Sequence, residues 1–370
     1  MAVRRPGRKQ TLTAVSRRQV APRAALASLL VFVMCFWARA GPPPKPGGAR
    51  VASDSYRLRV FGLPVIESVA ELAAATHLSP ALLYHLCQFP DRFYRRFSIP
   101  KKSGAGARQI RCPARPLKAL QAWLLRAILD SVKVHPAATA FRKGHGLRSN
   151  VTPHRENRYF LCLDIEDFFP SIGYAKVWTV FRTLGYNAHM SHVFASICTC
   201  DGVLPQGGVT SPALSNIVCF RMDARLAGYC GKHNVAYTRY ADDMTLSATS
   251  PRVLVAARRM CTRITRDEGF ALNERKTRVM GPRQCRHVTG LVVSDRGTVG
   301  VGRRRERVLR AAIARGATRD TGLTDAEGRR LRHRIRGWLD YLQDVDRPRA
   351  DRLKRYRTAL LERWQVSDQA

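Results

Sequence analysis

Apolar residues recur along this chain at two spacings, and each spacing predicts a different element. Helical spacing, with apolar positions three and four residues apart, predicts helices over residues 66–87, 117–132, 174–184, 213–231 and 253–268. Within the first stretch Ser79-Pro80 marks a helix start, because serine caps helices and proline suits their first turn. From residue 303 on, the pattern is again helical.

Shorter runs of alternating apolar and polar residues predict strands and hairpins. Residues 94–100 and 108–112 flank a basic turn and predict a basic hairpin, and residues 235–247 predict a second hairpin. Further strands are predicted over residues 159–165, around Val279 and over residues 287–293. Helices and antiparallel hairpins mix without a repeated βαβ order, which predicts the α+β fold class.

Composition places the chain among globular proteins with a polyanionic partner. The 370 residues are 45% hydrophobic, and we expect two or three domains. The net charge is +37, from 64 Lys and Arg against 27 Asp and Glu. An excess of this size favours a nucleic acid, whose phosphates bind Lys and Arg. The alternative is a GC-rich genome that encodes Arg at solvated positions.

The ten cysteines predict a reducing setting. None stands in a C-x-x-C pair, and Cys198 and Cys200 lack a histidine at the spacing of a zinc site. No disulfide framework is therefore expected, and we expect a cytoplasmic protein.

The first 50 residues contain no acidic residue and differ from the rest of the chain. An apolar run over residues 24–37 is followed by Ala38-Arg-Ala40, as in a secretory signal. The run is short for a membrane span. We expect a poorly ordered extension, or a start codon placed too far upstream, and no stable membrane partner; a membrane anchor is the alternative.

Three carboxylates carry the candidate chemistry. Asp242 and Asp243 lie at the tip of the hairpin predicted over residues 235–247, and Asp164 ends the strand predicted before it. Adjacent carboxylates repel each other, so a bound cation or a raised pKa is expected. Two Mg²⁺ ions, with Mn²⁺ as a substitute, would activate a 3′-hydroxyl and stabilise a leaving pyrophosphate. The alternative for any one Asp is a turn cap.

A glycine-rich loop before a helix is the second candidate site. Gly207 and Gly208 permit close backbone approach, so Gln206 is expected to touch a nucleotide. The alternative is an ordinary turn before the helix that begins at Ser211-Pro212.

Four motifs in order give the chain its resemblance to reverse transcriptases. They are Leu163-Asp164-Ile-Glu-Asp-Phe-Phe169, Leu204-Pro-Gln-Gly-Gly-Val-Thr-Ser-Pro212, Tyr240-Ala-Asp-Asp243 and Leu272-Asn-Glu-Arg-Lys-Thr277. The resemblance implies a right-hand polymerase fold, with fingers, a palm built on an antiparallel sheet, and a helical thumb. It implies metal binding by Asp164, Asp242 and Asp243.

The same resemblance implies roles for residues around the metals. Phe169 matches the bulky position that excludes a ribose 2′-hydroxyl, Arg108 and Lys102 match residues that hold the triphosphate, and Lys276 matches a palm lysine near the primer or metals. The alternative for each basic residue is solvated charge.

A finer resemblance is to bacterial retron reverse transcriptases. Asn150-Val-Thr-Pro-His154 is similar to their Asn-Ala-x-x-His signature, and Val288-Thr-Gly290 matches their Val-Thr-Gly signature. RNA binding is accordingly implied for Asn150, His154, Val288, Thr289 and Gly290. The resemblance further implies dNTP substrates, a cognate noncoding RNA as template and primer, and cDNA begun at an RNA 2′-hydroxyl. It also implies anti-phage defence with a toxin or effector.

Four regions follow: the extension 1–50, a helical region 51–93, fingers and palm 94–302, and a basic thumb 303–370, in which Trp338 is expected in the core. Two alternatives stay open, namely another bacterial reverse transcriptase (group II-like or abortive-infection) and a catalytically silent RNA-binding protein.

Overall fold

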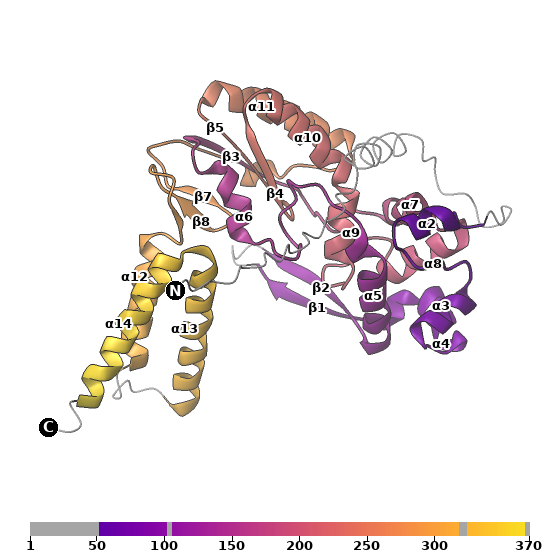
Figure 1. Cartoon of the computed structure of the whole chain (residues 1–370), viewed down its shortest axis with the longest axis horizontal. Coiled ribbons are helices and arrows are strands. Elements are labelled where there is room, and N and C mark those ends of the chain that lie inside the picture. The colour runs from indigo at the N-terminus through magenta and orange to yellow at the C-terminus, as the bar shows by residue number, and fades with distance from the viewer. Residues whose placement is uncertain (1–51, 102–105, 318–323, 367–370) are drawn as a thin grey trace, which may run out of the picture. The chain divides into compact units, whose positions relative to one another are not determined.

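Helices and antiparallel strands alternate irregularly in the computed structural model, which confirms the α+β class (Figure 1). The structure describes residues 52–101, 106–317 and 324–366, so the predicted extension 1–50 and Lys102 lie outside the described residues. All described residues belong to one compact unit, Pro42–Ala370. The boundaries at 93/94 and 302/303 therefore stay predictions about subdomains.

The helices follow the predicted stretches with a few breaks. They are α2 (Ser55–Val60), α3 (Val69–Thr76), α4 (Pro80–Gln88), α5 (Arg115–Ala127), α6 (Leu147–Val151), α7 (Tyr174–Leu184), α8 (Ala188–Cys198), α9 (Ser211–Val218), α10 (Phe220–Lys232), α11 (Pro251–Asp267), α12 (Arg303–Ala317), α13 (Asp325–Val345) and α14 (Arg347–Val366). As predicted, the Ser79 side chain caps α4, by accepting a hydrogen bond from the Leu82 amide. Among the described helices, none is long and apolar enough to cross a membrane.

The strands form three antiparallel sheets. They are β1 (Tyr94–Pro100), β2 (Ala107–Pro113), β3 (Tyr159–Asp164), β4 (Ala236–Tyr240), β5 (Asp243–Ala248), β6 (Arg278–Met280), β7 (Arg286–Val288), β8 (Leu291–Val293) and β9 (Val299–Gly300). The sheets have the orders β1-β2, β4-β5-β3-β6 and β7-β8-β9. The two predicted hairpins are thus present as β1-β2 and β4-β5.

The two faces of the four-stranded sheet are covered to different extents. Side chains alternate between the faces of a strand, and the buried Leu161, Leu163 and Leu246 belong to one face. Helix α11 packs against β3 and β5, and α10 against β4 (Figure 1). Residues of the other set, such as Cys162 and Arg278, line cavities. One face is therefore covered by helices, and the other, called the open face, is open at its Asp164 end, although Phe160 and Ser247 of the same set are buried.

The last three helices share a core with the β7-β8-β9 sheet. On α13 the residues Leu331, Ile335, Leu339 and Leu342 are buried at helical spacing, which confirms an amphipathic helix. Trp338 corrects the prediction: it is 36% exposed and meets Tyr341 edge-on. It follows buried Ile335 by three residues but falls at the margin of the buried stripe.

The stretch predicted as a strand over residues 287–293 is a hairpin. Strand β7 ends at Val288, β8 begins at Leu291, and the two strands pair with each other. The two residues between them, Thr289 and Gly290, have φ of 45° and 85°. Positive φ at both loop residues suits the tight turn of a hairpin, and it explains why the run folds back instead of continuing.

Candidate active site

A strained hairpin tip carries two of the predicted carboxylates. In the β4-β5 hairpin Tyr240 pairs with Asp243, so Ala241 and Asp242 form a two-residue loop. Ala241 has φ of 58°, in the left-handed region that favours glycine. The Asp242 carbonyl accepts a hydrogen bond of 3.0 Å from the Ile165 amide, which ties the tip to the end of β3.

The third carboxylate lies directly across the sheet. Asp164 is the last residue of β3, and the register pairs it with Asp243 at the start of β5. Cross-strand partners have side chains on the same face, so the carboxylates of Asp164 and Asp243 share the open face. The structure thus brings Asp164, Asp242 and Asp243 together at one end of the sheet. Asp242 and Asp243 lie at the predicted hairpin tip, and Asp164 lies at the predicted strand end.

Burial and mutual repulsion destabilise the charged forms of the hairpin carboxylates. Burial raises the pKa of Asp242, and the Asp164 charge adds to this rise, while Lys276 and Arg108 oppose it. Burial, followed by the charges of Asp242 and Asp164, raises the pKa of Asp243 to about 6. These are the conditions under which a divalent cation stabilises a carboxylate cluster.

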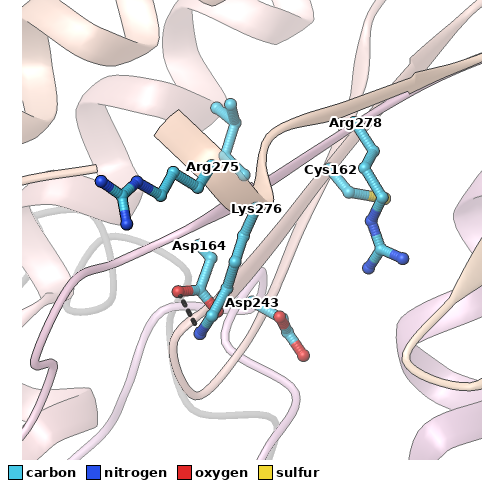
Figure 2. Close-up of a pocket in the computed structure, with 7 residues that line it drawn as sticks. Cys162, Asp164, Asp243, Arg275, Lys276 and Arg278 are labelled. Carbon is cyan, nitrogen blue, oxygen red and sulfur yellow. Dashed lines mark hydrogen bonds and ion pairs between the residues drawn. The ribbon is translucent and has the colours of Figure 1, made fainter. Parts of the chain in front are cut away.

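A lysine partly neutralises this cluster. The Lys276 ammonium lies 2.7 Å from Asp164 Oδ1, and the side chain of Lys276 is 57% exposed. The ion pair with Asp164 raises the pKa of Lys276. Figure 2 shows Lys276 reaching toward Asp164 with the Asp243 carboxylate beside them, whereas Arg275 extends away. A cavity of about 320 Å³ opens here, and Cys162, Leu163 and Arg278 also line it.

The donor set fits divalent metal ions. The reverse transcriptase motifs imply two Mg²⁺ ions, and carboxylate oxygens are the protein ligands that Mg²⁺ prefers. Asp164, Asp242 and Asp243 supply such oxygens beside a cavity, and among the described residues Asp164 is the one of the three with a cationic partner within 4 Å. That partner is a largely exposed lysine, which can move aside when a cation binds.

Another acidic group lies away from this end of the sheet. Within the described ranges, Asp91, Cys200 and Asp201 form the group whose possible metal-ligand atoms all lie within 4.8 Å of one another. The two carboxylate oxygens of Asp201 each lie 2.8 Å from an arginine, Arg96 and Arg111. The group is therefore already charge-balanced and joins the β1-β2 hairpin to the loop after α8.

The predicted nucleotide contacts lie on three separate elements. Phe169 is a partly exposed ring, 5.4 Å from the ring of buried Phe168. Gln206 is partly exposed, and its carbonyl accepts a 2.9 Å hydrogen bond from the Arg111 amide of β2. Arg108, also on β2, is exposed and close enough to oppose the rise in the Asp242 pKa. The prediction for Lys102 falls outside the described residues.

The residues predicted to bind RNA fall into a buried set and a surface set. Asn150, His154 and Val288 are 0% exposed, and the RNA-binding role implied for them stays a prediction. Thr289 and Gly290 are partly exposed and line a cavity of about 390 Å³ that also borders Asp243.

The buried set supports the surface set from below. Asn150 Nδ2 donates a 3.2 Å hydrogen bond to Thr289 Oγ1, so the two retron-like motifs contact each other. The ring nitrogens of His154 lie 2.7 Å from Ser247 Oγ and 2.8 Å from Thr238 Oγ1. Both residues therefore tie α6 and the turn after it to the hairpins of the active site.

Several residues of the site were not predicted. Arg278 lines both cavities and Arg305 one of them. The sequence offered a signal for Arg278, because it directly follows the Leu272–Thr277 motif and lies two residues after Lys276. Arg305 is one of many arginines after residue 302, so nothing in the pattern singles it out. The buried pair of Arg239 and Asp223, whose side chains are 0% exposed, was also missed, because nothing in the spacing links α10 to β4.

Comparisons with known proteins agree with this geometry. Residues 99–293 match the family described as reverse transcriptase (RNA-dependent DNA polymerase). The retron Ec86 reverse transcriptase of Escherichia coli is 39% identical over 312 residues, covering 84% of this chain and 95% of that protein. The retron Mx65 reverse transcriptase of Myxococcus xanthus is 34% identical, covering 82% of this chain and 74% of that protein.

A solved telomerase from Candida albicans, in complex with a fragment of telomeric RNA, shows a looser likeness. Its TM-score is 0.45 at 10% identity, over 72% of this chain and 60% of that chain. The four motifs, the carboxylates across β3 and β5, and the two retron relatives together identify the chain: it belongs to the retron-type reverse transcriptases, which are RNA-directed DNA polymerases with a right-hand fold.

Proposed function

We propose that this chain copies a cognate structured noncoding RNA into single-stranded DNA that stays joined to the RNA, by nucleotidyl transfer at two divalent ions. The observation that carries the proposal is the convergence of Asp164, Asp242 and Asp243 at one end of the sheet, beside a cavity lined by basic residues. The second alternative, a silent RNA-binding protein, has no comparable observation in its favour.

The proposed metal ligands are Asp164, Asp242 and Asp243. When bound, two Mg²⁺ ions, or Mn²⁺ in their place, lower the pKa of the attacking hydroxyl and stabilise the leaving pyrophosphate. Lys276 balances the charge of Asp164 before metal binds, and its exposure supports exchange for an ion. Lys276 then stays near the nucleic acid as a positive charge.

The proposed nucleotide site lies between the carboxylates and the β1-β2 hairpin. Phe169 presents the edge that excludes a ribose 2′-hydroxyl, and Arg108 approaches the triphosphate together with Lys102. Gln206 stands on a loop held against β2 by the Arg111 amide, which supports a contact with the incoming dNTP. Arginine and lysine are suited to phosphate oxygens.

The proposed RNA contact is the Thr289–Gly290 turn. Its partial exposure and its place at the cavity beside Asp243 support a direct contact. Asn150, His154 and Val288 act from below, since their burial leaves them to hold this turn and the neighbouring strands.

The biological part of the proposal rests on the family. We propose that cDNA synthesis begins at a 2′-hydroxyl of the cognate RNA, and that the product acts in anti-phage defence with a toxin or effector protein. The test is the plating efficiency of phages on cells that carry the gene with its flanking DNA. Loss of protection in the Asp242→Asn variant is expected, and equal plating on wild-type and empty cells would contradict the defence role.

The decisive experiment is to sequence the nucleic acid that co-purifies with the protein expressed together with its flanking DNA. Wild type is expected to yield a defined RNA joined to single-stranded DNA. Asp242→Asn is expected to retain the RNA and lose the DNA. Glu166→Gln is the matched control, because Glu166 is an exposed acid in the Asp164 motif and is expected to yield the wild-type product. DNA synthesis by Asp242→Asn would overturn the metal site, and RNA alone from all three would favour a binding role.

A further inference from the structure

An arginine is fully buried directly beneath the hairpin tip. Arg239 lies on β4, two residues before Ala241, and its side chain is 0% exposed. Transferring an isolated charge to a protein interior is strongly unfavourable, so the group must have strong partners. Arg239 has two of them, and one of the two belongs to the tip itself.

The first partner is the carboxylate of Asp223 on α10, which is also 0% exposed. Arg239 Nε lies 2.8 Å from Asp223 Oδ1, and Arg239 Nη2 lies 2.6 Å from Oδ2, which is a two-point ion pair. The Tyr237 hydroxyl donates to the same Oδ1 at 2.8 Å. Well-packed hydrophobic residues of similar volume often replace a buried ion pair without loss of stability, so packing alone is a weak reason for the charges.

The second partner is the carbonyl oxygen of Ala241. Arg239 Nη1 donates a 3.0 Å hydrogen bond to it. Ala241 has φ of 58°, a left-handed conformation that a residue with a Cβ adopts only with strain. The same carbonyl belongs to the peptide that leads into Asp242. The guanidinium therefore holds the strained peptide from which the Asp242 side chain projects.

The backbone of Arg239 is held as firmly as its side chain. Its amide donates a 2.8 Å hydrogen bond to the Ala137 carbonyl, and its carbonyl accepts one of 2.9 Å from the Thr139 amide. A guanidinium with a fixed backbone and two fixed partners is a rigid reference point. Its orientation is passed to the tip through the Ala241 carbonyl.

We propose that the Asp223–Arg239 pair is a positioning device that sets the orientation of the Asp242 carboxylate through the Ala241 carbonyl. The inference rests on the proposed role of Asp242 as a metal ligand. Arg239 touches neither substrate nor metal in this scheme. Its loss misplaces a ligand, and misplacement of about 1 Å near reacting atoms costs up to roughly a hundredfold in rate.

The test compares Arg239→Lys with Tyr237→Phe in the full-length chain. Lysine keeps the positive charge beside Asp223, but a single ammonium cannot reproduce the planar fork that also reaches Ala241. Tyr237→Phe removes another donor to Asp223 and leaves the contact with Ala241 intact, so it is the matched control. The readouts are thermal unfolding, single-dNTP incorporation on an RNA template with a DNA primer, and Mn²⁺ binding by electron paramagnetic resonance without nucleotide.

Arg239→Lys is expected to lower kcat by roughly ten- to a hundredfold with little change in the KM for dNTP, and to weaken Mn²⁺ binding. Tyr237→Phe is expected to stay within about threefold of wild type in kcat, well below the loss produced by misplacing a ligand. A merely structural role would lower the unfolding temperature in both variants and leave the Mn²⁺ affinity of the folded protein unchanged. That outcome, or wild-type kcat and Mn²⁺ affinity in Arg239→Lys, would overturn the inference.

A second variant tests the strain argument directly. Glycine adopts positive φ without the Cβ penalty, so Ala241→Gly is expected to shrink the fold-loss in kcat caused by Arg239→Lys. An undiminished loss in the Gly background would contradict a role through the Ala241 peptide. If Arg239→Lys does not fold, Asp223→Glu replaces it, because it keeps the charge and displaces the carboxylate by one methylene.

Failure of this inference is distinguishable from failure of the proposed function. Inactive Asp242→Asn with fully active Arg239→Lys would remove the positioning role alone. Full activity of Asp242→Asn would remove the proposed metal site itself, whatever Arg239→Lys does.

Discussion

Phe169 is positioned by other aromatic rings. Its ring lies 5.4 Å from that of buried Phe168 and 6.4 Å from that of Phe141, which is 48% exposed. The guanidinium of Arg239 lies 5.8 Å from the centre of the Phe168 ring, so the same buried side chain also packs against these aromatic rings. A ring supported in this way is rigid enough to reject a substrate by shape.

Replacing Phe169 by valine is expected to admit ribonucleotides. The smaller side chain leaves room for a 2′-hydroxyl, and the ratio of kcat/KM for rNTP to that for dNTP is expected to rise roughly ten- to a hundredfold. Single-nucleotide incorporation with paired rNTP and dNTP measures the ratio. Phe89→Ala is the control, since it removes a 41% exposed ring whose ring contact is with His85 and not with this aromatic group, and its ratio is expected to stay as in wild type. Unchanged sugar selectivity in Phe169→Val would remove the assigned role.

His154 makes the folded state sensitive to acid. Burial lowers its pKa to about 3, well below the ordinary value of 6.5, so the unfolded chain binds a proton below pH 6.5 that the folded chain does not. The stability that neutral His154 supports is complete above pH 6.5 and is lost as the pH falls toward 3. Between about pH 7.5 and 5 the loss amounts to about 2 kcal/mol.

The variant His154→Gln is expected to lack this pH-dependent loss. Urea unfolding at both pH values measures it: wild type should lose about 2 kcal/mol more than the variant between them. His145→Gln removes an exposed histidine and should behave as wild type. Parallel loss in wild type and His154→Gln would show that the buried ring does not titrate on unfolding.

At the scale of residues, the sequence predicted where the three carboxylates lie better than it predicted the burial of the residues around them. Asp164, Asp242 and Asp243 were predictable because a strand end and a hairpin tip are local features. The burial of Asn150 and His154 was not predictable, because it depends on segments distant in sequence. The partner of Asn150, Thr289, lies 139 positions away, and the partner of His154, Ser247, lies 93 positions away. The Asp223–Arg239 pair likewise joins two elements.

Among the elements, the loop before α9 depends on one close backbone approach. Gly207 has φ of 120°, and a Cβ there would lie 2.9 Å from the Arg111 carbonyl oxygen of β2. Glycine is therefore required both by conformation and by space. This approach keeps Gln206 next to the β1-β2 hairpin that carries Arg108.

Gly207→Ala and Gly202→Ala form a matched pair. Gly202 also has a positive φ, of 72°, but nothing lies within 4 Å of a Cβ at that position. Gly202→Ala is expected to cost about 1 kcal/mol, and Gly207→Ala about 2–3 kcal/mol because the clash adds to the conformational penalty. Urea unfolding of both variants measures the difference. Equal losses of unfolding free energy in the two variants would show that the loop can shift away from β2 without an energetic cost.

Long periodic elements were predictable, whereas their interruptions were not. The bounds predicted for 174–184 match α7, because its apolar stripe is local. The stretch 213–231 divides at Cys219 into α9 and α10, and 287–293 divides at Thr289–Gly290. Both breaks fall inside apolar runs, where periodicity continues although the backbone turns, and tertiary packing decides where it does so.

At the scale of the whole molecule, described arginines lie on both sides of the four-stranded sheet. On the open side, the exposed Arg278 and Arg305 line the cavity of about 390 Å³ beside Asp243. Helix α11 packs on the covered side and carries the exposed Arg252 and Arg259. Net charge alone predicted a polyanionic partner but did not say which arginines meet it. The open face, which borders the carboxylates, is the surface a template strand must reach.

The salt dependence of RNA binding distinguishes the two sides. Each phosphate contact releases counterions, so log K falls with log[salt] with a slope of about −0.7 per contact for a single strand. Replacing Arg278 and Arg305 together by serine is expected to make the slope shallower by about 1.4, as two contacts are lost. Replacing Arg252 and Arg259 by serine removes the same charge from the covered side and should leave the slope unchanged. Fluorescence anisotropy of a labelled single-stranded RNA over a salt series measures both. If the two double variants change the slope equally, RNA binds through the net charge of the protein and does not prefer the open face. If only the replacement of Arg278 and Arg305 changes the slope, the template lies along the open face beside Asp243.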